Sequence, residues 1–233
     1  EEAGQPAREA LRGSITEALL TFGQGFIAHP ENEALRKALS DGSLSAKDYT
    51  HELLRLMYRF LFVFCLEERN LINIKDDSKK NQAATARYLS GYALHRFRDQ
   101  SLKSYFRNRY SDAWESVKIV FQGLDNGEPL LALPALGGLF ASDECPHLKD
   151  TRLSNVVFFN AMKLMRWATI NDTYTAIDYK NLGTEELGSI YESLLELVPV
   201  ADPQRREFSF LNNTVGSSER KKTGSYYTPD SLV

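Results

Sequence analysis

The sequence predicts a mainly α-helical protein: a multi-helix, bundle-like domain with an irregular Gly/Pro loop and a short strand-and-loop C-terminal tail. Apolar residues recur at spacings of three and four over most of the 233 residues, which places them on one face of a helix. Glycine and proline gather in residues 125–146, "DNGEPLLALPALGGLFASDECP", as is typical of an irregular loop. Residues 207–213, "EFSFLNN", alternate in polarity as a short strand does.

The first predicted helix covers residues 8–26, and its apolar face consists of Leu11, Ile15, Leu19, Phe22 and Phe26. Residues 49–72 are apolar on nearly every side, which is typical of a central helix packed by others all round. The longest uncharged run in this helix, residues 60–66, is far shorter than the roughly 18–20 residues that a membrane span needs. We therefore expect a buried helix here, and no membrane association.

Two further helices are predicted on either side of the Gly/Pro loop. In each of them the apolar side chains share one face: Trp114, Val117, Phe121 and Leu124 in residues 112–124, and Phe158, Met162 and Met165 in residues 153–169. These helices are therefore expected to pack against the central one.

Residues 184–198 have the clearest helical pattern in the chain. The apolar stripe is uninterrupted and consists of Leu187, Ile190, Tyr191, Leu194, Leu195 and Val198. Thr184 is the predicted N-cap, and Pro199 follows the helix end. Gly188 lies in the interior, where glycine costs about 1 kcal/mol relative to alanine. A close backbone contact is the expected reason for this glycine.

Composition limits the classes of function. The net charge is −3 and the pI is about 5.9, whereas a dedicated nucleic-acid-binding module usually has a basic excess, so any DNA contact must be a local patch. Cys65 and Cys145 lie far apart, and no spaced histidine cluster accompanies them. Neither a disulfide framework nor a metal site is predicted, and with the acidic, polar start a cytoplasmic location is expected.

Familiar catalytic signatures are absent from the sequence. There is no P-loop, no dinucleotide-binding glycine motif, no H-E-x-x-H and no G-x-S-x-G. Cys145 and His147 lie near Asp143, but three such residues in one loop are common by chance, so no nucleophile is assigned to them. The adjacent carboxylates at 67–68 and 76–77 are expected to be solvated surface charges.

Residues 87–110 mix cations with aromatic residues. The segment has six Lys/Arg residues and one Asp, a composition that can follow phosphates and stack on bases. The candidate DNA contacts are Arg96, Arg98, Arg107 and Arg109. The alternative, which we favour on sequence alone, is an amphipathic helix pair with aromatic residues in the core and solvated arginines.

The last residues, "GSYYTPDSLV", predict the start of a helix. Thr228 can cap it, and Pro229 suits the first helical position because its φ is fixed. The free N–H groups at such a start attract a carboxylate. Tyr226 and Tyr227 lie just before it and are suited to contact an apolar or cationic group.

Two stretches together resemble a known family. "LGSIYESLLEL" at 187–197, followed after a variable stretch by "RKKTGSYYTPDSLV", is similar to the region before the catalytic domain of large adenine-N6 DNA methyltransferases. These are the type IIG restriction–modification enzymes and related phage-defence methylases. "LLRLMYRFLFVFCLEERNLI" and "LPALGGLF" resemble the helical region that precedes the methylase domain, so the resemblance covers nearly the whole chain.

The resemblance implies a cofactor, S-adenosylmethionine, and a partner, DNA. In the family the G-S-Y-Y-T-P stretch lines the cofactor pocket near its methionine end. Tyr226, Tyr227, Thr228 and Pro229 would then contact or frame the cofactor, and Gly224 would permit the turn. The activity implied for the parent enzyme is methyl transfer from S-adenosylmethionine to an adenine flipped out of DNA.

The sequence also departs from the family pattern. The family's Gly-rich loop and its catalytic Asn-Pro-Pro-aromatic motif come later in the chain, and no Asn-Pro pair occurs here. The nuclease domain that often precedes the helical region is missing too. We therefore expect a middle piece of a larger enzyme that lacks catalytic residues and binds S-adenosylmethionine weakly or not at all.

The domain assignment follows from this expectation. Residues 1–200 would form a helical connector between the adjoining nuclease and methyltransferase domains, and residues 201–233 a linker and the first segment of a truncated methyltransferase domain. The alternative from another class of protein is a non-catalytic helical interaction or DNA-positioning module, in which the tail is an ordinary capped helix.

Overall fold

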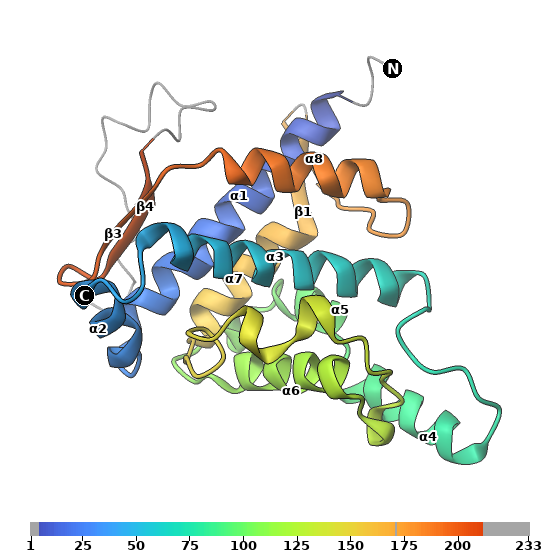
Figure 1. The fold of residues 1–233 in the computed structure, drawn as a ribbon. Coiled ribbons are helices and arrows are strands. Elements are labelled where there is room, and N and C mark those ends of the chain that lie inside the picture. The colour runs from blue at the N-terminus through green and yellow to red at the C-terminus, as the bar shows by residue number, and fades with distance from the viewer. Residues whose placement is uncertain (1–4, 171, 212–233) are drawn as a thin grey trace.

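The computed structural model describes residues 5–170 and 172–211, and over this part the chain is mainly helical, as predicted. The framework consists of the two longest helices and a shorter one that packs along the first (Figure 1). α1 (Gln5–Ala28) packs along α7 (Asn155–Arg166) and against α3 (Ala46–Glu68), which lies in front of both in this view. α6 (Asp112–Asn126) contacts α7, and α8 (Thr184–Leu195) contacts both α1 and α3.

Shorter elements connect these helices. They are α2 (Glu33–Asp41), α4 (Lys79–Arg87), the π-helical turn η2 (Tyr88–Tyr92), α5 (His95–Gln100) and the 3₁₀ turn η3 (Ser104–Phe106). The predicted Gly/Pro loop is irregular and consists of the 3₁₀ turns η4 (Pro129–Leu131), η5 (Gly138–Phe140) and η6 (Ser142–Glu144).

The core is rich in aromatic rings from different helices. The ring of Phe60 on α3 lies 5.4 Å from that of Phe22 on α1 and 5.4 Å from that of Phe121 on α6. The apolar faces predicted for residues 8–26, 112–124 and 153–169 are all buried, and α3 is buried along most of its length. Within the described residues, no helix is long and apolar enough to cross a membrane.

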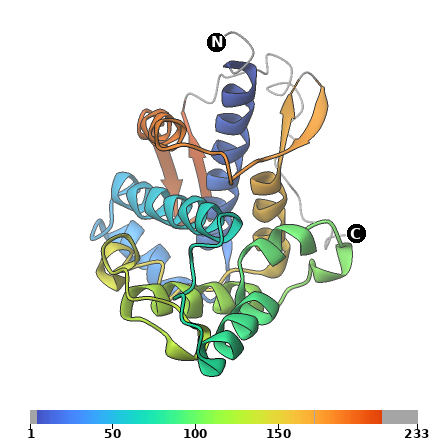
Figure 2. The same cartoon turned by 90° about the vertical axis from the view of Figure 1, so that its right-hand side faces the viewer.

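Two antiparallel hairpins complete the fold (Figure 2). β1 (Trp167–Ile170) pairs with β2 (Thr173–Ala176), and β3 (Pro199–Asp202) pairs with β4 (Glu207–Phe210). The strand at 207–210 is confirmed, whereas continued helix at 167–169 is wrong. Asp172 turns the chain with φ 60°, and the β-branched residues around it favour strands. β3 crosses the predicted domain boundary at 200, and β4 packs on α1.

The glycines of "GQG" in α1 let other elements approach the helix closely. A Cβ at Gly23 would lie 2.5 Å from the Phe208 ring of β4, and one at Gly25 would lie 2.3 Å from Val157 of α7. Between them, the Gln24 amide donates to the Arg206 carbonyl at 2.9 Å and accepts from the Phe208 N–H at 2.7 Å. This stretch therefore holds the second hairpin against the first helix.

The C-terminal helix differs from the sequence expectation in three respects. Thr184 is the first helical residue and Gly183 holds the N-cap position, so the predicted cap is wrong. No atom of residues 5–170 or 172–211 outside the helix's own turns lies within 4 Å of the position that a Gly188 side chain would take, so this part of the chain does not provide the expected close contact. Half of the apolar stripe faces outward, because Tyr191, Leu195 and Val198 are 37%, 47% and 45% exposed.

Candidate functional site

The predicted cofactor residues lie outside the described part of the chain. Gly224, Tyr226, Tyr227, Thr228 and Pro229 all fall within residues 212–233. Their contact with S-adenosylmethionine therefore stays a prediction from the sequence.

The loop residues Cys145 and His147 are close in sequence, and they bond to different groups of Glu52. The Cys145 thiol donates to the Glu52 carbonyl at 3.6 Å, while the His147 ring meets the Glu52 carboxylate at 2.6 Å. Burial raises the pKa of Cys145 to about 11, so the sulfur stays protonated at neutral pH and is a weak nucleophile. Asp143 is exposed on the neighbouring turn. This arrangement tethers the loop to α3 and provides no activated nucleophile.

Glu67 on α3 is buried, so the expectation that it is a solvated surface charge is wrong. Its carboxylate accepts the N–H groups of Leu94 and His95 at 2.7 and 2.8 Å, and the Tyr88 hydroxyl also donates to it. Because a buried charge is costly without such partners, these bonds fix the start of α5 against the end of α3. Because the N–H groups of Leu94 and His95 donate to Glu67, they do not form the backbone hydrogen bonds that would continue one helix through this point.

The predicted amphipathic helix pair at 87–110 is wrong, because the helix is interrupted at this point. α4, η2, α5 and η3 are separate short elements, and the chain turns between them. Figure 2 shows the stretch in green, folded around one side of the bundle. The four candidate arginines therefore do not share a helix face.

Arg98 is buried and does not reach the surface. Its guanidinium donates to the Glu68 carboxylate at 2.6 Å, and its side chain is only 5% exposed. The guanidinium carbon also lies 4.4 Å from the centroid of the Phe64 ring and 4.7 Å from that of Tyr179. An ion pair between two aromatic faces is a core contact, so the assignment of Arg98 to a DNA-facing surface is corrected.

The other three candidates are more accessible. Arg107 is half-buried and donates to the Asn160 side chain at 3.0 Å and to the Ser101 carbonyl, both of them uncharged. Arg109 is exposed and lies over the Tyr110 ring at 5.7 Å. Arg96 is half-buried. None of the three forms an ion pair with a carboxylate of the described residues, so their charges remain available.

Residues 101–110 also expose aromatic surface, and we call this stretch the basic-aromatic surface. Tyr105 is 69% exposed and Tyr110 is 61% exposed. Lys103 and Arg109 lie beside them in sequence, and the stretch "SLKSYFRNRY" contains no acidic residue. The combination of open rings and unpaired cations is typical of a nucleic-acid-binding surface.

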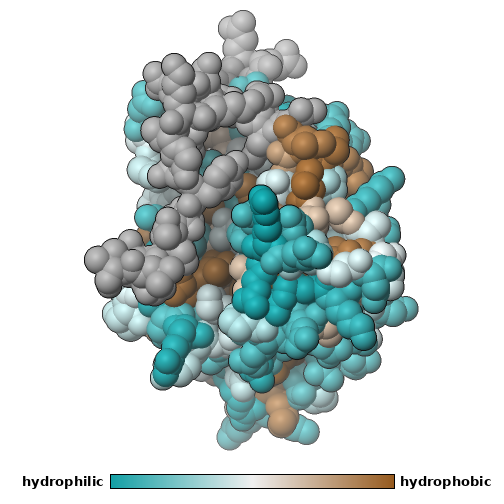
Figure 3. Space-filling view, turned by 90° about the vertical axis from the view of Figure 1, so that its left-hand side faces the viewer, coloured by the Kyte–Doolittle hydropathy of each residue, from teal (hydrophilic) through white to brown (hydrophobic). Residues whose placement is uncertain are grey.

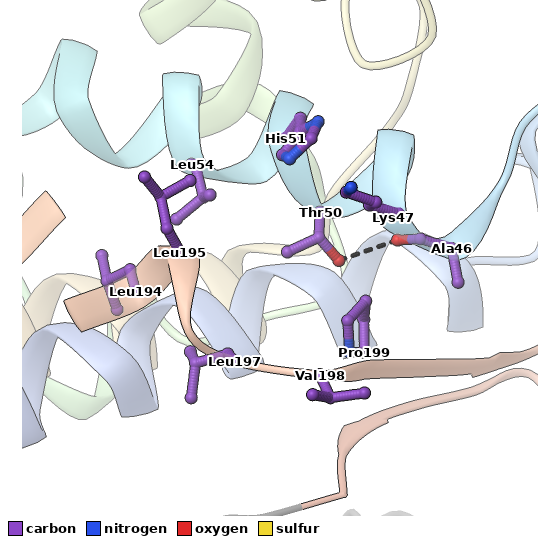
Figure 4. A pocket seen from close by; sticks show the side chains of 10 residues that line it. All are labelled: Ala46, Lys47, Thr50, His51, Leu54, Leu194, Leu195, Leu197, Val198 and Pro199. Carbon is purple, nitrogen blue, oxygen red and sulfur yellow. Dashed lines mark hydrogen bonds between the residues drawn. The ribbon is translucent and has the colours of Figure 1, made fainter. Parts of the chain in front are cut away.

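An apolar groove of about 440 Å³ lies elsewhere, between α3 and the end of α8 (Figure 4). Leu54 and Thr50 line it from α3, and Leu195, Val198 and Pro199 line it from the other side. The Thr50 hydroxyl is already bonded to the Ala46 carbonyl at 2.8 Å. Hydrophobic patches also interrupt the hydrophilic surface on the face that carries β3 and β4 (Figure 3). The groove is mainly apolar, and its polar lining residues are Lys47, Thr50 and His51.

No group of His, Cys, Asp and Glu side chains in the described residues is arranged to hold a metal ion. No family model, curated protein or solved structure matches the chain. The exposed rings and the cations of residues 101–110 make the basic-aromatic surface the candidate site.

Proposed function

We propose that this chain is the helical connector region of a site-specific adenine-N6 DNA methyltransferase of the restriction–modification type, and that it helps to position DNA. The parent enzyme would transfer a methyl group from S-adenosylmethionine to adenine. The mainly helical fold is compatible with this assignment, and the pairing of "YESLLE" with "GSYYTP" suggests it. The observation that carries the DNA contact is the basic-aromatic surface.

Electrostatics supports this surface as the DNA contact. The protein is acidic overall, so DNA approaches it favourably only where cations are gathered and unpaired. The described hydrogen-bond partners of Arg107, the Asn160 side chain and the Ser101 carbonyl, are uncharged, and Arg109 adds a second cation two residues further on. Each cation that meets a phosphate releases counterions, which gives a dependence of affinity on salt.

Fluorescence anisotropy with labelled duplex DNA tests this contact. The double variant Arg107→Glu, Arg109→Glu is expected to bind more weakly, and its plot of log K against log salt to be flatter by about 0.9 for each phosphate that the variant no longer neutralises. The control is Arg12→Glu, Arg205→Glu, which changes the net charge equally at exposed positions elsewhere. If the two double variants gave the same slope of log K against log salt, the basic-aromatic surface would not be the DNA contact.

The methyltransferase assignment is tested separately, by the coding sequence downstream of Val233. A Gly-rich loop followed by Asn-Pro-Pro-Tyr or Asn-Pro-Pro-Phe supports the assignment, and a downstream coding sequence without them contradicts it. Isothermal titration of this chain with S-adenosylmethionine is expected to show weak or no binding. Micromolar affinity would contradict the expectation that the cofactor pocket needs more than these residues.

The groove between α3 and α8 favours the second candidate, a non-catalytic helical interaction module. Its walls expose Leu195 and Val198, and exposed apolar residues gathered in one place often mark an interface. If this module acts by protein interaction, the groove makes the contact, and Leu195→Asp is expected to disrupt that association while leaving the fold intact.

A further inference from the structure

Tyr105 is the outermost ring of an aromatic column that begins in the core. Its ring centroid lies 4.3 Å from that of Phe106, and the Phe106 ring lies 5.5 Å from that of Phe159. Phe159 is buried and meets Phe158 and Phe97 edge-on at 5.3 and 6.0 Å. The column therefore supports Tyr105 from below, on a base that close packing holds in place.

Most of the Tyr105 surface is open to solvent, although Phe106 packs against its ring. Tyr105 is 69% exposed, whereas Phe159 at the base is 2% exposed. A supported ring with one open side is a stacking platform, because a second flat ring can lie on it without displacing protein atoms. Nucleobases stack on such rings whatever their identity, since every base has a π-face.

Tyr174 on β2 shows that exposure alone does not make a platform. It is 71% exposed, as open as Tyr105, yet no aromatic ring of the described residues lies against it. It also belongs to a hairpin with no cation between Trp167 and Ala176. Tyr174 therefore provides a matched control for the ring column under Tyr105.

The charges around Tyr105 suit a phosphate backbone. Lys103 and Arg107 flank it at two residues on either side, and Arg109 follows. The nearest carboxylates in sequence are already engaged: Asp99 pairs with Arg166, and Asp112 accepts the Asn155 amide at 2.8 Å. Because no carboxylate in the described part of the chain pairs with Lys103, Arg107 or Arg109, these cations can attract phosphates on both sides of a stacked base.

We propose that the basic-aromatic surface binds single-stranded DNA, with one unpaired base stacked on Tyr105 and the backbone following Lys103 and Arg109. This inference rests on the proposed DNA contact and names the form of DNA that the surface prefers. A duplex buries the faces of its bases in its own stack, so its interior bases cannot reach the ring. A single strand offers both the phosphates and a free base face.

The experiment measures anisotropy of three labelled probes: a short oligothymidylate, an abasic oligonucleotide of the same length, and a duplex of that length. The wild-type protein is expected to bind the oligothymidylate more tightly than the abasic strand, which has the same charge but no bases. Tyr105→Ala is expected to weaken oligothymidylate binding about tenfold and to leave abasic binding unchanged.

Two further variants separate the ring from its surroundings. Tyr105→Phe keeps the platform and is expected to bind within about twofold of wild type, since stacking needs the ring and not the hydroxyl. Tyr174→Ala is expected to bind as wild type does. Circular dichroism checks that each variant is folded, which is expected because both tyrosines are exposed.

The outcomes distinguish this inference from the proposed function. Equal binding of the oligothymidylate by wild type and Tyr105→Ala, or equal binding of the oligothymidylate and the abasic strand by wild type, overturns the stacking proposal. If the wild-type protein still binds the duplex in that case, the proposed DNA contact is retained, but without a base stacked on Tyr105. Loss of affinity in Tyr174→Ala equal to that in Tyr105→Ala also overturns the stacking proposal.

Discussion

Residues 87–100 and residues 101–110 carry the same mixture of cations and aromatic rings, yet they occupy opposite environments. In the first half, Tyr88 and Phe97 are buried and Arg98 is ion-paired inside the protein. In the second half, Tyr105 and Tyr110 are open and the cations face no described carboxylate within ion-pair distance. The first half contributes Tyr88, Phe97 and Arg98 to the core, whereas the second half forms the candidate DNA-binding surface.

The partners explain the difference. The end of α3 supplies adjacent carboxylates: Glu67 takes the backbone N–H groups at the start of α5, and Glu68 takes the Arg98 guanidinium. No carboxylate among the described residues pairs with Lys103, Arg107 or Arg109, so no described ion pair neutralises their charges. The same residue type therefore stabilises the fold in one half and is free to bind a ligand in the other.

The largest expected effect is that of the substitution Arg98→Glu. It places a second carboxylate beside Glu68, between the rings of Phe64 and Tyr179, and an unpaired buried charge costs about 3–5 kcal/mol. Urea denaturation followed by circular dichroism measures the free energy of unfolding. Arg109→Glu is the control, with an expected change below about 0.5 kcal/mol. If the two variants lost the same free energy of unfolding, residues 87–100 and residues 101–110 would not differ in their contribution to stability.

A smaller loss is expected for Glu67→Gln. The neutral amide keeps one acceptor oxygen, but its NH₂ group faces the N–H donors of Leu94 and His95 and leaves a buried donor unsatisfied. The expected loss in the free energy of unfolding is about 1–3 kcal/mol. Glu192→Gln, at an exposed position on α8, should leave that free energy unchanged. A Glu67→Gln protein as stable as wild type would show that this carboxylate does not anchor α5.

The smallest effect concerns pH and Tyr88. Burial, with the neighbouring Glu67 carboxylate, raises the pKa of Tyr88 well above its ordinary value. The unfolded tyrosine has a pKa of about 10, so the folded form holds its proton more tightly. The resulting stability is present below about pH 10 and disappears as the pH rises above it.

Tyr88→Phe should therefore lose less stability than wild type between about pH 9 and pH 11, by about 1 kcal/mol at the upper limit. Denaturation curves at matched pH values measure this difference. Tyr110→Phe, at an exposed position, should follow the wild-type curve. Parallel curves for Tyr88→Phe and wild type would show that the Tyr88 hydroxyl is not held protonated by the fold.

Local periodicity was sufficient to predict the fold class and most of the helices. The faces of α1, α6 and α7 repeat every three to four residues, and burial of Leu19, Val117 and Phe158 confirms them. The first hairpin was missed, because its strands are short and the apolar pattern of α7 runs directly into Trp167. The N-cap at Gly183 was missed because glycine has no side chain to mark the position.

The candidate site was only partly predictable. The sequence indicated a mixture of cations and rings at 87–110, but which arginine is buried depends on Glu68, Phe64 and Tyr179, which lie in other parts of the chain. The same holds for Tyr105, whose support comes from Phe159 on α7. Composition shows which groups are available, and only long-range packing decides which of them reach solvent.

The docking of β4 on α1 has a consequence for how the protein is made. The Phe208 N–H bonds to Gln24 across 184 positions of sequence, and its ring covers Gly23. During synthesis the first helix leaves the ribosome long before this partner exists, and α7, its other main neighbour, is also late. The part of the α1 apolar face that packs on α7 and β4 therefore stays uncovered until late in synthesis, although α3 is available early, and such long-range contacts are expected to slow folding.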